Sequence, residues 1–133
     1  MIEPVPDTYA MPLSLDNAGP VVRITASGPV SYSEILELFQ AMMRKAPRVR
    51  GVPVFVDTRG VTDAPSTPEL RLIAVEVKQL TDAGFGPIAV LTGSAWMYGV
   101  VRMFSVFVQS ATEVVALRCI EDAEAWVDRP VSG

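Results

Sequence analysis

Apolar residues along this chain follow two patterns that alternate. Short apolar runs bounded by turn-forming residues predict strands, and they lie at 9–15, 20–26, 52–56, 87–91 and 113–117. Longer segments with apolar residues at every third or fourth position predict helices, and they lie at 31–45, 68–83, 94–111 and 121–127. The predicted order is ββαβαβαβα.

This alternation predicts one α/β domain over residues 1–133 with helices packed on a mostly parallel sheet of about five strands. The turn-forming residues 16–19 join the first two strands into a predicted hairpin, so the sheet is expected to be mixed. Residues 1–7 are expected to be flexible, and 130–133 to form a tail.

The segment from Gly51 to Leu70 shows how one strand passes into a helix. Its apolar run ends at Asp57-Thr58-Arg59-Gly60, which predicts a polar turn. Ser66 with Glu69 forms a capping-box pattern, and Pro68 suits the first turn of a helix. Loops of this kind carry the binding sites of many open α/β sheets.

Two strand-to-helix junctions of this kind are candidates for an anion or phosphate site. If the strands at 52–56 and 87–91 are parallel, both junctions meet at one edge of the sheet. Helix N-termini there offer free N–H groups to an anion. The candidate residues are Arg59, Ser66, Thr67, Thr92 and Ser94. The alternative is that these residues serve only as helix caps and turns.

A series of short motifs resembles the SpoIIAA-like proteins, relatives of the STAS domains of anti-sigma-factor antagonists and anion transporters. The motifs are Val54-Phe55-Val56-Asp57 with Gly60, Pro65-Ser66, Ile88-Ala89-Val90-Leu91-Thr92, Tyr98-Gly99 with Arg102-Met103-Phe104, and Glu121-Asp122-Ala123-Glu124-Ala125-Trp126. The resemblance implies the SpoIIAA-like fold and a small binding module, often self-associating, for a protein partner or an apolar ligand.

The resemblance also implies an alternative function as a regulatory switch. In anti-sigma-factor antagonists a serine at the start of the corresponding helix is phosphorylated, and Ser66 or Thr67 matches its place. The aspartate before that serine and the glycine after it are missing here, and Pro68 stiffens the segment.

The predicted helix at 94–111 carries more apolar residues than one buried face needs. Only Arg102, Ser105 and Gln109 form a polar stripe, whereas a surface helix has a broad polar face. The surplus apolar surface is expected to be covered by the rest of the domain, by a second copy in a homodimer, or by an apolar ligand. The residues assigned to that ligand site or interface are Trp96, Met97, Val100, Met103, Phe104 and Phe107.

Composition removes several function classes. The chain has no histidine, one cysteine and a net charge of −4. Enzymatic activity, a metal site and a cofactor are therefore not expected, nor is nonspecific nucleic-acid binding, which depends on Lys and Arg. No signal peptide or membrane span is recognised, so a cytoplasmic location is expected. Cys119 is predicted to be a buried structural thiol.

Overall fold

The computed structural model describes residues 13–16, 21–46 and 50–128. The strands are β1 (Leu13–Asp16), β2 (Val22–Pro29), β3 (Val52–Asp63), β4 (Phe85–Leu91) and β5 (Val114–Leu117). The helices are α1 (Tyr32–Arg44), α2 (Thr67–Asp82), α3 (Ala95–Val108) and α4 (Ile120–Asp128). This is the predicted order of elements.

The five strands form one sheet in the order β1-β2-β3-β4-β5. Strands β2 to β5 are parallel to one another, and β1 pairs antiparallel with β2. The predicted mixed sheet is therefore confirmed. The expectations for residues 1–7, 9–12, 17–19 and 130–133 lie outside the described residues.

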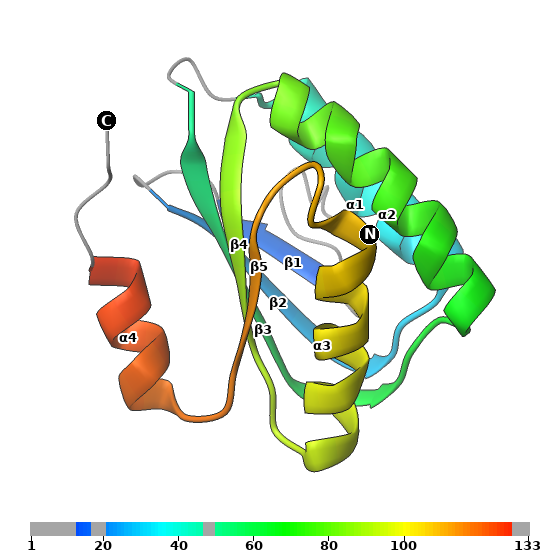
Figure 1. Ribbon diagram of the computed structural model, residues 1–133, viewed down its shortest axis with the longest axis vertical. Helices are drawn as coiled ribbons and strands as arrows, with labels where there is room; N and C mark the ends of the chain where they lie inside the picture. Colours follow the sequence, from blue (N-terminus) through cyan, green and yellow to red (C-terminus); the bar gives the residue numbers. More distant parts are fainter. Residues whose placement is uncertain (1–12, 17–20, 47–49, 129–133) are drawn as a thin grey trace, which may run out of the picture.

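Helices cover the two faces of the sheet unequally (Figure 1). Helices α1, α2 and α3 lie on one face, where their apolar side chains pack against inward-facing residues of β2 to β5. Helix α4 lies on the other face, where Ala123 and Trp126 pack against Val21, Phe55 and Leu91. The main core therefore lies between the sheet and the three-helix layer.

The predicted helix starts are confirmed in detail. Ser31 and Ser66 each accept a hydrogen bond from the backbone N–H three residues later, and the Glu34 and Glu69 carboxylates accept one from the backbone N–H of the capping serine. These reciprocal capping boxes satisfy N–H groups that have no partner inside a helix.

The predicted turn at Asp57–Gly60 is wrong, because β3 continues through these residues to Asp63. The pairing of β3 with β4 ends at Asp57, but β3 stays paired with β2 from Gly60, opposite Ser27, to Asp63, opposite Pro29. A side chain at Gly60 would press on Ser27, since an added Cβ would lie 3.1 Å from the Ser27 Cβ. Glycine therefore marks close strand packing here, where the sequence pattern indicates a turn.

Candidate functional site

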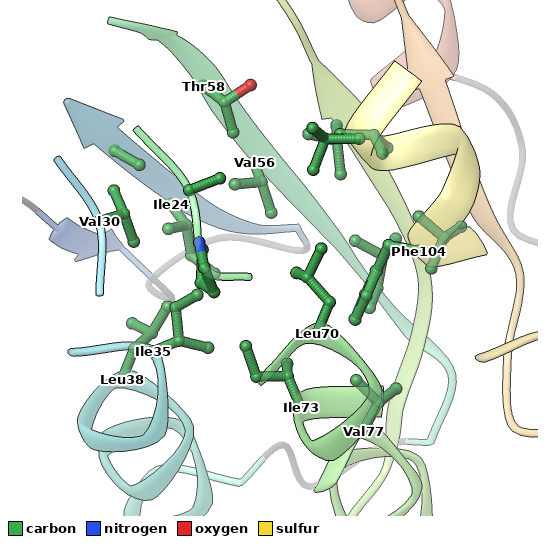
Figure 2. A pocket seen from close by; sticks show the side chains of 18 of the residues that line it. Ile24, Val30, Ile35, Leu38, Val56, Thr58, Leu70, Ile73, Val77 and Phe104 are labelled. Atoms are coloured by element: carbon green, nitrogen blue, oxygen red, sulfur yellow. The ribbon is translucent and has the colours of Figure 1, made fainter. Parts of the chain in front are cut away.

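An apolar cavity lies between the sheet and the three-helix layer (Figure 2). Its volume is about 170 Å³. In Figure 2, Ile24, Val56 and Thr58 line it from the sheet, and Leu70 and Phe104 line it from helices α2 and α3. Protein interiors are close-packed, and voids larger than a water molecule are few. A cavity of this size in a 133-residue chain is therefore a candidate binding site.

The described part of the cavity wall is apolar except at one residue. The lining comprises Ile24, Ala26, Val30, Ile35, Leu38, Phe39, Met42, Val54, Val56, Thr58, Val61, Ala64, Pro65, Leu70, Ile73, Val77, Leu80, Ile88, Val90, Met97, Val100, Val101, Phe104 and Val114. The Thr58 hydroxyl donates a hydrogen bond to the backbone carbonyl of Leu91 at 2.9 Å. Among the residues that the structure describes, no charged side chain lines this cavity.

The cavity extends from the deep core toward the edge of the sheet where the parallel strands end. Met42 and Leu80 at its inner part are almost fully buried. Val61, Ala64 and Pro65, which lead from β3 to α2, are only partly buried. Open α/β sheets bind their ligands at this carboxyl edge. The cavity therefore lies where such a fold places a ligand site.

Three of the six residues predicted on α3 line the cavity, namely Met97, Val100 and Phe104. The other three lie outside it. Trp96 is about half exposed, at 49%. The Met103 sulfur lies 3.9 Å from the Thr67 hydroxyl, and Phe107 lies under the Arg71 guanidinium, 4.3 Å from the ring centroid.

Most of the cavity wall comes from residues outside the predicted ligand site. Leu70, Ile73, Val77 and Leu80 of α2 all line the cavity. Their helical spacing predicts a buried face. Such spacing gives no sign that the face borders a void, because a tightly packed helix has the same pattern.

Arg59, assigned to a possible anion site, points its guanidinium to a neighbour on its own strand. Its Nη2 lies 2.8 Å from the Asp57 carboxylate, in an ion pair whose side chains are 52% and 21% exposed respectively. Burial raises the pKa of Asp57, but hydrogen bonds and charge from Arg59 outweigh burial and hold that pKa below its ordinary value. The Asp57 carboxylate in turn raises the pKa of Arg59.

The remaining residues of the predicted anion site also have partners. The Thr92 hydroxyl donates to the Leu117 carbonyl at 2.9 Å, and Ser94 accepts from the Met97 N–H as the cap of α3. Gly93 packs closely against the backbone of Arg59. The structure therefore brings Gly93 of the second junction against Arg59, whereas Ser66 and Thr67 come after the end of β3 at Asp63. The polar side chains of Arg59, Thr92 and Ser94 are bonded to the protein itself.

Ser66 and Thr67 are exposed at the start of α2. The Ser66 hydroxyl accepts from the Glu69 N–H at 3.3 Å and donates to the Glu69 carboxylate at 3.1 Å. The predicted capping role of Ser66 is confirmed. A phosphate on Ser66 would meet the negative charge of Glu69, which opposes the favourable field of the helix N-terminus. Phosphorylation of either residue stays a prediction.

Cys119 is exposed, so its predicted burial is wrong. It precedes α4, and its carbonyl accepts from the Ala123 N–H. A backbone hydrogen bond at Asp122 lowers the pKa of the thiol, but the carboxylates of Asp122 and Glu121 outweigh it and raise the pKa. A raised pKa reduces the thiolate fraction, which is the reactive form.

Two further classes of feature are missing from the described part of the chain. Residues 13–16, 21–46 and 50–128 contain no group of three or more acidic, histidine or cysteine side chains placed to hold a metal ion. Among the same residues, no helix is both long enough and apolar enough to cross a bilayer.

Comparison with known proteins gives a match at the level of structure. No family model matches the sequence, and no curated protein matches it. The structure is similar to that of an uncharacterized protein of the DUF3478 family from Shewanella loihica PV-4, which is described as having a SpoIIAA-like fold. The match has a TM-score of 0.60 and 11% sequence identity, and it covers 86% of this chain and 91% of the other. The chain therefore has the SpoIIAA-like α/β fold that its sequence motifs predicted.

Proposed function

We propose that this protein is a non-enzymatic binding module that holds a small apolar ligand in the cavity between the sheet and helices α1 to α3. The observation that carries the proposal is a cavity of about 170 Å³ whose lining, in the described part of the chain, is apolar apart from Thr58. For comparison, an engineered cavity of about 150 Å³ with an apolar lining stays dry and binds benzene. The volume thus suits a ligand of about the size of one aromatic ring.

The energetic cost of an empty cavity supports the same proposal. Cavities left by large-to-small core substitutions destabilise proteins by about 24 cal/mol per Å³, so a ligand that packs against the buried part of this cavity would stabilise the protein. Natural domains are stable by only about 5–15 kcal/mol. A ligand that fills the void restores the missing contacts, which gives the bound state a direct energetic advantage.

Titration with toluene tests the proposal, with unfolding temperature and amide NMR shifts as the readouts. A ligand present at ten times its Kd raises the free energy of unfolding by about 1.4 kcal/mol. The unfolding temperature should therefore rise, and amide shifts should change at α2 and β3 residues such as Leu70 and Val56. Native mass spectrometry should also show a copurifying small molecule. If the amide shifts do not change saturably and no bound mass is found, the proposal is contradicted.

We also propose that a second copy of the chain binds to α3, which would make the protein a homodimer. Trp96 and Val106 on α3 are 49% and 58% exposed, and Leu72 and Val75 on α2 are exposed as well. Exposed apolar side chains on two helices that pack together are the kind of surface that a second copy would bury. Light scattering at high micromolar concentration should give the dimer mass, and Val106→Glu should give the monomer mass. A monomer mass for the unaltered protein would contradict the proposal.

A further inference from the structure

The chemical class of the ligand follows from the hydrogen bond of Thr58, the one polar residue among the described residues of the cavity wall. Thr58 lies directly after the last residue pair between β3 and β4, which is Asp57 opposite Leu91. Its hydroxyl donates to the Leu91 carbonyl and so takes the place of the next bond in the ladder. Both polar groups are therefore already paired with each other.

The Thr58 side chain points its hydroxyl away from the cavity. Figure 2 shows the oxygen pointing away from Ile24, Val56 and Leu70, so that the methyl group faces the cavity. Thr58 is buried, with 6% of its surface exposed. Turning the hydroxyl toward a ligand would break the bond to Leu91 and leave a buried carbonyl without its donor, which is costly.

We infer that the cavity selects ligands without hydrogen-bonding groups and rejects hydroxylated analogues of the same size. The inference rests on the proposed function and names its ligand class, a neutral hydrocarbon. A buried hydroxyl without a partner loses its bonds to water and gains none. The expected discrimination between a hydrocarbon and its hydroxyl analogue is at least about tenfold in Kd.

Toluene and phenol provide the test, because they are similar in size and differ in one methyl or hydroxyl group. Calorimetry on the unaltered protein should give a Kd for toluene at least about tenfold lower than that for phenol. A smaller difference would overturn the inference and leave the proposed function standing, because the cavity would still bind both probes. If neither probe binds, the proposed function fails and the inference fails with it.

Two variants distinguish an effect of the Thr58 hydroxyl on binding from an effect of the apolar cavity wall as a whole. Thr58→Val removes the hydroxyl and should leave the ratio of the two Kd values unchanged; a selective loss of phenol binding would show that the hydroxyl serves the ligand. Val56→Thr places a hydroxyl on a wall position that faces the cavity in Figure 2, and should reduce the ratio about threefold or more. An unchanged ratio in that variant would contradict the inference even if Thr58→Val does not fold.

Discussion

Replacing Val77 with phenylalanine is expected to stabilise the protein and to abolish binding of toluene. Val77 is 1% exposed and lines the cavity from α2. Phenylalanine and valine have similar helix propensities, so the local helix should tolerate the change. The larger ring would fill part of the 170 Å³ void and raise the free energy of unfolding by about 1 kcal/mol. Thermal unfolding and toluene titration measure the two effects.

Val108 offers a matched control for this substitution. It is also a helical valine, it is also 1% exposed, and it belongs to the same core cluster, but it does not line the cavity. Val108→Phe should therefore overpack the core and lower the free energy of unfolding by about 1–3 kcal/mol. The two variants should differ by about 2–4 kcal/mol. Equal destabilisation by both would mean that no usable space exists beside Val77.

The capping residues show which parts of the fold can be predicted from sequence. Ser31 with Glu34, and Ser66 with Glu69, each form a bond between residues three apart, so the chemistry is local. A local rule then fixes where each helix begins. The regular alternation of apolar segments likewise predicts the parallel sheet, because each strand and helix must bury its own apolar face.

The continuation of β3 shows why the site was harder to predict. Asp57, Arg59 and Gly60 have turn chemistry, yet they remain in the strand because β2 pairs with Asp57 and with Gly60, on either side of an irregularity in the register. Arg59 and Asp57 form an ion pair two residues apart, as alternate residues on one face of a strand can. Tertiary pairing thus overrides a local turn signal, and the predicted loop is absent.

The cavity itself depends on how well side chains from seven elements, β2 to β5 and α1 to α3, fill a shared space. Leu70 and Phe104 have the spacing of buried residues, and the sequence predicts that burial. Whether buried side chains leave a void depends on distances between elements, which no periodicity records. The surplus of apolar residues on α3 predicted a ligand site on that helix, but α3 forms only one wall of the cavity.

The spacing of β3 and β4 at the inner part of the cavity leads to the second large effect. Gly86 lies in β4 directly against the backbone of Gly51, and the Gly51 N–H donates to the Gly84 carbonyl at 2.7 Å. A methyl group at Gly86 would overlap the Gly51 backbone. Two residues farther along, Val54 pairs with Ile88, and both line the cavity. Close contact at these two glycines therefore holds the two strands together beside the ligand site.

Gly86→Ala is expected to lower the free energy of unfolding by about 2–3 kcal/mol and to weaken toluene binding, because the backbone must move to admit the methyl group. Gly99→Ala is the matched control, since an added Cβ there meets nothing within 4 Å. Gly99 lies inside α3, where alanine should raise the free energy of unfolding by about 0.8–1.0 kcal/mol. Neither glycine has a positive φ, so conformational freedom does not separate them. Urea unfolding of both variants measures the difference, and similar stabilities would show that the Gly51–Gly86 contact can open without cost.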